Sequence, residues 1–307
     1  MDINYMVFDI GGTAIKWAVA NEFGDILTDG KIAVPNDADA FFDALADKTN
    51  ELKSYNLMGI AISAPGAVNC ETSVIGGSSA IKYIHGPNFR RILNQKTGLN
   101  VEIENDANCA ALGECWLGAG KGHQDSAFVV CGTGIGGAVV KNKRIHGGIH
   151  QHGGEFGYCI MDFDPSQKAP ERFKTWSQVG STVALVREVA KRKQCDPNTL
   201  SGLQVFEMAA NQDQDAIESI DRFYYYMAIG IYNIQYQYDP EIIVLGGAIS
   251  EREDFLAEVE KRMDDIMESL PDAKIRPKIA VNQFGNRANL LGALYHYLSR
   301  NQSIDEE

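Results

Sequence analysis

Residues 6–20 read MVFDIGGTAIKWAVA, an apolar run that meets two glycines and is followed by a second apolar run. We therefore predict two strands, 6–10 and 15–20, joined by a tight hairpin. The second half of the chain repeats this layout, because residues 127–131 and 138–141 also flank a glycine-rich stretch. Two strand–glycine–strand hairpins indicate an internally duplicated α/β chain, with two similar domains and a cleft between them.

The rest of the chain alternates strand-like and helix-like stretches, which is typical of α/β layers. Further strands are predicted at 58–63, 101–104 and 242–245. Apolar residues three or four apart predict helices, and the longest of them covers 217–234 and ends before Pro240.

The domain boundary is expected near residue 118, with the last helix returning to the first domain. The expected domains are a small N-terminal domain of residues 1–118 plus 286–307 and a larger C-terminal domain of residues 119–285. A chain of 307 residues suits two domains, at roughly 100–200 residues each.

The net charge of −13 and the pI near 4.9 disfavour a broad nucleic-acid or anionic-membrane surface. Any bound phosphate must then be held by local amides and a few cations. No apolar run approaches the ~20 residues that span a bilayer, and the N-terminal sequence lacks the layout of a signal peptide. We therefore expect a cytoplasmic protein. Its six cysteines form no C-x-x-C pair and are expected to be plain thiols.

The stretch Gly132-Thr133-Gly134-Ile135-Gly136-Gly137 matches G-x-G-x-x-G by letter count. A dinucleotide fingerprint requires this run to open a helix. The strand-like AVVKNKRI follows here instead, so a Rossmann site is excluded. A P-loop is excluded as well, because neither hairpin carries Gly-Lys followed by Ser or Thr.

Both glycine hairpins nevertheless suit a phosphate, because bare backbone N–H groups form an anion-binding nest. Thr13 and Thr133 add hydroxyl donors, and Lys16 adds a cation. Asp9, just before the first glycines, is a candidate ligand for Mg²⁺, directly or through water. The alternative is two tight hairpins that hold no ligand.

Residues 104–108 read ENDAN, at a point where a strand gives way to a helix. One interpretation is an N-cap, in which Asn or Asp accepts the unpaired amides of the helix. The other is a ligand site, because α/β sheets bind ligands at the carboxyl ends of their strands. Asp106 could then take a proton from a substrate hydroxyl, and Asn105 could bond a neighbouring hydroxyl.

Six motifs carry a resemblance to a known family: DIGGTAIK, SAPGAV, ENDAN, GTGIGG, GGEFG and VLGGAIS. They occur in the order found in the ROK family, and the resemblance covers essentially the whole chain. It implies the duplicated actin/hexokinase-like (ribonuclease H-like) fold, and an ATP-dependent sugar kinase that uses Mg²⁺ and forms a homodimer. Some members are repressors with an added DNA-binding segment, but about five residues before the first strand leave no room for one.

The resemblance also implies roles for individual residues. Asp106 is the implied catalytic base. The implied sugar contacts are Gly66, Asn105, Asp106, Glu155 and, in the loop 75–86, Ser79. The implied ATP and phosphate site consists of Asp9, Gly11, Gly12, Thr13, Lys16, Gly132, Thr133, Gly134, Gly136, Gly246 and Gly247, with Asp9 holding Mg²⁺ through water.

The sequence departs from the family pattern at a zinc site. Many members have G-E-x-G-H followed by a cysteine run, and the histidine and three cysteines bind structural zinc. This chain has Tyr158 in place of the histidine, and the matching residues 173–182 contain no cysteine. Zinc prefers thiolate and imidazole ligands, so we predict no structural zinc.

The same departures bear on the substrate. In the family, the histidine and a glutamate contact the edge of the sugar that carries the C1 and C2 substituents. This chain has Tyr158 and Ser177 at those positions, so both polar anchors are lost. Tyr158 is still expected to contact the substrate. The stretches FDIGGTA-x-K, GIAISAPG, ENDANC and GEFGY resemble a zinc-less subgroup of the family that includes kinases for β-glucosides. This resemblance implies a kinase for the 6-hydroxyl of a β-glucoside such as cellobiose. N-acetylmannosamine kinase and glucokinase are the alternatives within the class. A non-catalytic sugar sensor and an unrelated nucleotide hydrolase of the same superfamily are the alternatives outside it.

Overall fold

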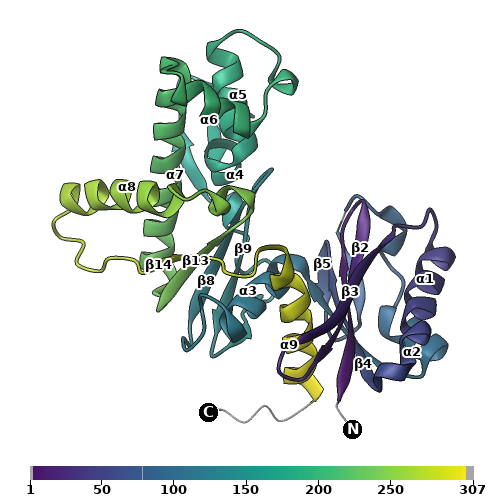
Figure 1. The fold of residues 1–307 in the computed structure, drawn as a ribbon. Helices are drawn as coiled ribbons and strands as arrows, with labels where there is room; N and C mark the ends of the chain where they lie inside the picture. Colours follow the sequence, from purple (N-terminus) through teal and green to yellow (C-terminus); the bar gives the residue numbers. More distant parts are fainter. Residues whose placement is uncertain (1–2, 78, 302–307) are drawn as a thin grey trace. The chain divides into compact units, whose positions relative to one another are not determined.

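The computed structural model describes residues 3–77 and 79–301, which form two compact units (Figure 1). Unit 1 comprises the described parts of 1–121, 143–151 and 286–307, and unit 2 comprises 122–142 and 152–285. Residues 143–151, expected in the second domain, thus cluster with unit 1. The expected domain limits stay a prediction, and residues 302–307 of the first domain lie outside the described residues.

Unit 1 is built on a five-stranded sheet in the order β3-β2-β1-β4-β7. Its strands are β1 (Asn4–Ile10), β2 (Ala14–Asn21), β3 (Ile26–Ala33), β4 (Leu57–Ala64) and β7 (Asn100–Asn105). Strand β1 pairs antiparallel with β2 and parallel with β4, and β4 pairs parallel with β7. The four strands predicted in this half are therefore confirmed, each longer by two residues than expected.

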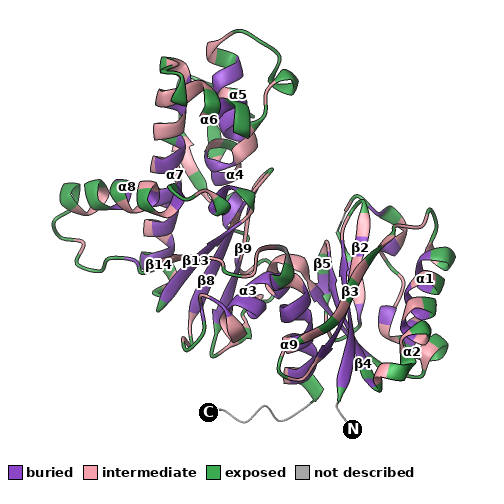
Figure 2. Cartoon of the chain, viewed as in Figure 1, coloured by how far each residue is buried: buried purple, intermediate pink, exposed green. Residues whose placement is uncertain are grey.

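Helices cover the sheet of unit 1 on both faces. They are α1 (Ala38–Glu51), α2 (Phe89–Thr97), α3 (Asp106–Leu117) and α9 (Ala288–Asn301). Because successive side chains of a strand point to opposite faces, Met6 and Phe8 of β1 pack with α1 and α2, whereas Tyr5 and Val7 pack with α3 and α9. Strands β1, β4 and β7 are largely buried between these helix layers, whereas no residue of the edge strand β3 is fully buried (Figure 2). The short elements of this part are η1 (Lys53–Tyr55), β5 (Ala67–Asn69), β6 (Val74–Gly76), η2 (Lys82–Ile84), β10 (Arg144–Ile145) and η6 (Gly285–Arg287).

Unit 2 repeats the hairpin start of unit 1. Its sheet has the order β9-β8-β13-β14, with β8 and β9 antiparallel and β13 parallel to β8 and to β14. The strands are β8 (Ser126–Cys131), β9 (Ile135–Lys141), β13 (Ile242–Gly246) and β14 (Ile279–Val281). The predicted strand at 138–141 starts earlier, at Ile135, because Gly136 and Gly137 pair with β8 despite their weak preference for strands.

The helices of unit 2 pack around the long α7. They are α4 (Trp176–Gly180), α5 (Thr182–Arg192), α6 (Gly202–Ala210), α7 (Gln214–Tyr238) and α8 (Phe255–Ser269). The predicted long helix is confirmed as α7, which ends in a left-handed cap at Asp239 just before Pro240. The short elements are η3 (Phe156–Tyr158), β11 (Ile160–Phe163), β12 (Phe173–Thr175), η4 (Pro197–Thr199) and η5 (Ala248–Glu251).

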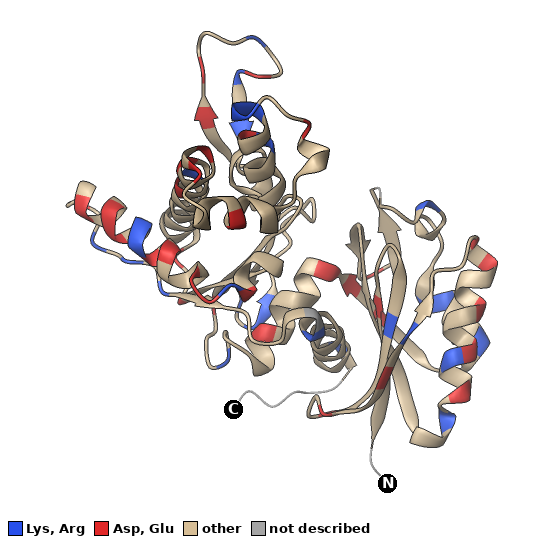
Figure 3. Cartoon of the chain, turned by 45° about the horizontal axis from the view of Figure 1, so that its top comes forward, with Lys and Arg blue, Asp and Glu red and all other residues tan. Residues whose placement is uncertain are grey.

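Figure 3 shows residues of both charges on α8, with the acidic ones in excess, in agreement with the acidic composition of the chain. Within the described residues, no helix is both long enough and apolar enough to cross a membrane.

Candidate active site

Asp9 lies near the end of β1 and is almost fully buried. Its Oδ1 accepts hydrogen bonds from Ser63 Oγ at 2.9 Å and from Asn289 Nδ2 at 3.1 Å. Its Oδ2 pairs with Lys16 Nζ at 3.1 Å. Ser63 on β4 and Lys16 on β2 lie opposite Asp9 in the sheet register, so the two neighbouring strands hold the carboxylate in place. Ser63 and Asn289 were not expected from the sequence.

Asn105 ends β7 and caps α3. Its Oδ1 accepts the backbone N–H groups of Ala107 and Asn108, so the N-cap interpretation is correct for Asn105. Its Nδ2 donates to Gly66 O and to Asp106 Oδ1, both at 3.0 Å. The cap therefore also aims the side chain of the next residue.

Asp106 is the first residue of α3 and is half-buried. Its Oδ1 accepts from Ala107 N at 2.9 Å and from Asn105. Its second oxygen, Oδ2, accepts no hydrogen bond from another described residue. Burial raises the pKa of Asp106 and the nearby Asp9 carboxylate raises it further, whereas the hydrogen bonds from Ala107 and Asn105 oppose this shift. A carboxylate with a raised pKa and an open oxygen has the properties of a general base.

Gly66 and Ser79 lie close together through His85. A Cβ at Gly66 would stand 3.2 Å from His85 Cε1. The Ser79 hydroxyl lies 2.8 Å from His85 Nε2 and donates to Ile81 O, while His85 Nδ1 lies 3.1 Å from Gly76 O. Ser79 thus serves the fold of its own loop, which includes residue 78 outside the described residues. The contacts of His85 with Ser79 and Gly76 could not be predicted from the sequence, because a single histidine in a loop forms no recognisable motif.

The first glycine hairpin forms a tight turn between β1 and β2. Gly11 N donates to Ala14 O at 3.1 Å, and a Cβ at Gly11 would stand only 2.9 Å from that oxygen. Gly12 and Thr13 are exposed at the tip, and Lys16 is half-buried beside Asp9. The geometry of the turn is therefore sufficient to account for a glycine at position 11. Gly12 and Thr13 instead expose their polar groups to solvent or to a ligand.

The second glycine hairpin, between β8 and β9, is more open. A Cβ at Gly132 or at Gly136 would meet nothing within 4 Å, while Thr133 is exposed at the tip. Gly132 O accepts both the backbone N–H and the hydroxyl of Thr182 at the start of α5. Packing therefore does not demand glycine at 132 and 136, and the backbone there is open to close approach by a ligand.

Gly246 ends β13, and Gly247 caps the following η5. Gly247 has φ +96°, and a Cβ there would lie 2.2 Å from Cys131 O at the end of β8. The backbone of this turn therefore packs directly on the second hairpin, which brings the two predicted phosphate-binding segments of unit 2 together.

Glu155 and Tyr158 are presented outward by a glycine loop packed on β9. Gly154 has φ +92°, and its Cβ would lie 2.6 Å from Ala138 Cα, while a Cβ at Gly157 would lie 2.1 Å from Ile135 O. Both Glu155 and Tyr158 are exposed. The glycines therefore press the loop backbone against the strand and leave the carboxylate and the phenol available.

Known proteins resemble the chain along its length. The family model described as "ROK family" matches residues 5–300. The chain belongs to the ROK family. A β-glucoside kinase of Listeria monocytogenes serovar 1/2a is 36% identical over 95% of this chain and 96% of its own.

Two solved structures of ROK proteins extend the comparison. A ROK family protein from Streptococcus pneumoniae TIGR4, in complex with sucrose, has a TM-score of 0.87 and 38% identity, covering 98% of this chain and 99% of its own. A ROK family glucokinase from Streptomyces griseus, in complex with glucose and AMPPNP, has a TM-score of 0.73 and 26% identity, covering 95% and 98%. The expected actin/hexokinase-like fold is confirmed, and the chain is an ATP-dependent carbohydrate kinase by class.

Proposed function

We propose that this ROK kinase transfers the γ-phosphoryl group of ATP to the 6-hydroxyl of a β-glucoside such as cellobiose. Support for the β-glucoside comes from the relative named β-glucoside kinase. The structural relative bound to sucrose, which is an α-glucoside, supports only a substituent on C1 of the glucose. N-acetylmannosamine kinase and glucokinase are the alternatives. The expected homodimer belongs to the same proposal and rests on family analogy alone.

The single observation that carries the chemistry is the open Oδ2 of Asp106. In the proposed step the sugar hydroxyl oxygen attacks the γ-phosphorus, its proton passes to Asp106, and the bond from the γ-phosphorus to the bridging oxygen breaks to release ADP. Asn105 donates to the other oxygen, Oδ1, at 3.0 Å and so leaves Oδ2 available for the proton. The raised pKa of Asp106 favours this proton transfer.

The phosphates are proposed to lie on the two glycine hairpins, near Lys16 and the N–H groups at 132–136. Mg²⁺ that accompanies ATP supplies charge neutralisation at the phosphates. Asp9 fits that ion through water and not directly, because both of its oxygens already have hydrogen-bond or ion-pair partners. The protein's own part is to hold the Asp9 carboxylate and the Lys16 ammonium in a fixed arrangement.

The preference for a glycoside is proposed from what unit 2 offers the sugar. Ser177 Oγ accepts from Ile135 N at 2.9 Å and donates to Ile135 O at 3.3 Å, so its hydroxyl is committed to the start of β9. Tyr158 is 74% exposed and supplies a phenol, which can pack against an apolar group. Glu155 then remains as the polar contact from this loop, since a carboxylate accepts two hydroxyl bonds.

A coupled assay of ADP release tests the proposal with glucose, N-acetylmannosamine, cellobiose and arbutin as acceptors. We expect the highest kcat/KM with cellobiose or arbutin, and ³¹P–¹H correlation in the product should place the phosphate on the 6-oxygen. A higher kcat/KM with glucose or N-acetylmannosamine would reject the glycoside preference but keep the kinase. No ADP release with any sugar would instead favour the non-catalytic sensor.

A further inference from the structure

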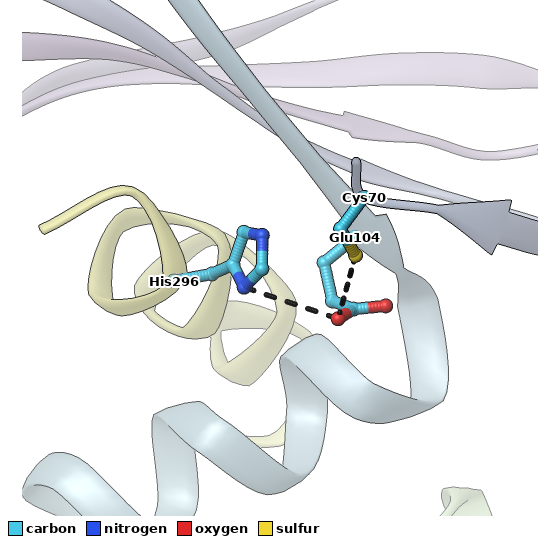
Figure 4. A group of neighbouring side chains, drawn as sticks. All are labelled: Cys70, Glu104 and His296. Carbon is cyan, nitrogen blue, oxygen red and sulfur yellow. Dashed lines mark hydrogen bonds and ion pairs between the residues drawn. The ribbon is translucent and has the colours of Figure 1, made fainter. Parts of the chain in front are cut away.

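Three side chains with metal-binding chemistry meet inside unit 1. Cys70 follows β5, Glu104 lies on β7, and His296 lies on α9 (Figure 4). Their nearest ligand atoms all lie within 4.8 Å of one another. Segments far apart in the sequence thus bring a thiol, a carboxylate and an imidazole to one point.

The distances suit a small tetrahedral ion. Cys70 Sγ lies 3.2 Å from Glu104 Oε2, and His296 Nδ1 lies 3.8 Å from the same oxygen. Ligands at the usual zinc bond lengths in a tetrahedron lie roughly 3.3–3.7 Å apart. These two spacings lie close to that range, and the Cys70–His296 spacing is at most 4.8 Å. The Cys70 thiol donates a hydrogen bond to Glu104 Oε2, and an ion would take the place of that proton.

His296 gives the second, independent indication. The side chain is only 10% exposed. Its Nε2 is buried without a hydrogen-bond partner among the described residues, and its Nδ1 is 3.8 Å from Glu104, too far for a hydrogen bond. Buried polar atoms nearly always have partners. The ring nitrogen that faces Glu104 in Figure 4 is Nδ1, which has no hydrogen bond among the described residues and is open to an ion, whereas the unpartnered Nε2 is the other ring nitrogen.

The neighbouring cations leave this cluster free. Arg90 and Arg300 both pair with Glu102, and Arg300 also pairs with Glu71. Neither arginine has a hydrogen bond or ion pair with Glu104 in the described part of the chain. The cluster borders a cavity of about 380 Å³, which gives an ion a route in and leaves room for a water ligand.

We propose that Cys70, Glu104 and His296 bind one zinc-class divalent cation, with water as a fourth ligand. A thiolate with an imidazole selects Zn²⁺ or Co²⁺ over Mg²⁺, which prefers oxygen ligands. Thiolate and carboxylate together balance the charge of the ion. The site is separate from Asp9, and also from Tyr158, which lies in unit 2.

The position of Glu104 links this site to the catalytic segment. Its other oxygen, Oε1, accepts from Asn105 N at 2.6 Å and from Asn108 Nδ2 at 3.0 Å. A cation held by Oε2 therefore braces the turn that carries Asn105 and Asp106, and it ties that turn to α9.

Cobalt titration of the metal-free full-length protein tests the site. We expect one Co²⁺ per chain, with a thiolate-to-cobalt charge-transfer band in the near ultraviolet that Zn²⁺ abolishes by displacement. Cys70→Ser should eliminate the band, and His296→Gln should weaken Co²⁺ binding by more than about 100-fold, since even indirect ligand support is worth 10–100-fold. Cys195→Ser, which removes an exposed thiol of unit 2, is the matched control and should keep the band.

Thermal melting gives a second readout. Zn²⁺ should raise the Tm of the wild type and of Cys195→Ser but not of Cys70→Ser, because only a folded site binds the ion. Circular dichroism without metal checks that each variant folds. If His296→Gln does not fold, the cobalt band and the Tm of Cys70→Ser are sufficient to test the proposal. A wild type without the band, or a band that survives Cys70→Ser, would overturn the proposal.

Discussion

Asp106 is the residue on which the proposed reaction depends, because Asn105 and Ala107 fix its Oδ1, while no other described residue donates a hydrogen bond to its Oδ2. Asp106→Asn keeps the two accepted hydrogen bonds but cannot take a proton. We expect kcat on the best sugar to fall about 10²–10⁴-fold, with ATP affinity unchanged by calorimetry. Asp47→Asn, which changes an exposed carboxylate on α1, should keep the wild-type kcat. Near-normal turnover by Asp106→Asn would show that the base lies elsewhere.

The same residue should make stability depend on pH. Burial raises the pKa of Asp106 in the folded state above its ordinary value of 3.8, so the folded protein binds this proton more tightly than the unfolded chain does. Ionisation of Asp106 therefore lowers the free energy of unfolding. This loss is absent below the pKa of the unfolded chain and complete above the raised pKa of the folded protein. Asp106→Asn should therefore be more stable than the wild type at pH 7.

Urea unfolding of both proteins at several pH values measures this difference. The stability gain of Asp106→Asn should shrink as the pH falls through the raised pKa and vanish near the ordinary pKa. A gain that stays constant with pH would mean that ionisation of Asp106 costs the fold nothing.

At the scale of elements, the contact of α3 with α9 supports the turn that carries Asn105 and Asp106, and this contact depends on glycine. A Cβ at Gly292 would stand 1.6 Å from Cys109 O, and one at Gly113 would stand 2.3 Å from Ala288 O. Because backbone cannot move aside cheaply, Gly292→Ala should destabilise the protein by about 3 kcal/mol, at the upper end of overpacking costs.

Gly202→Ala is the matched control for that helix contact. Gly202 is also helical, at the start of α6, but a Cβ there would meet nothing within 4 Å. Its replacement should leave the free energy of unfolding unchanged or raise it by up to about 1 kcal/mol. Equal effects of the two alanines in denaturant unfolding would contradict the tight α3–α9 packing.

The elements also show how far the sequence could predict the structure. Apolar periodicity located β1, β2, β4, β7 and α7, because that pattern is local. It placed the start of β9 three residues late, because the pairing of Gly136 and Gly137 with β8 is a tertiary effect. Ser63 and Asn289 could not be assigned to Asp9, since contacts between distant segments leave no spacing signal.

At the scale of the whole molecule, the proposed reaction draws on both units, Asp106 from unit 1 and the second glycine hairpin from unit 2. Gly136→Ala tests the contribution of unit 2, because its methyl group finds open space in the protein itself. We expect unchanged stability and kcat, with KM for ATP raised about tenfold, as a loss of ~1.4 kcal/mol of binding would give. Unchanged KM for ATP would mean that no phosphate approaches this backbone.

Combining the two variants tests whether the units contribute separately. Asp106→Asn should act on the chemical step and Gly136→Ala on ATP binding, and no hydrogen bond or ion pair among the described residues joins the two positions. Effects at independent sites add in free energy, so the loss in kcat/KM for ATP of the double variant should equal the product of the two single losses. A loss clearly smaller than the product would mean that the hairpin and the base act as one unit, as groups that share a single catalytic step do. The steady-state kinetics of the wild type, both single variants and the double variant, measured at saturating sugar, distinguish these outcomes.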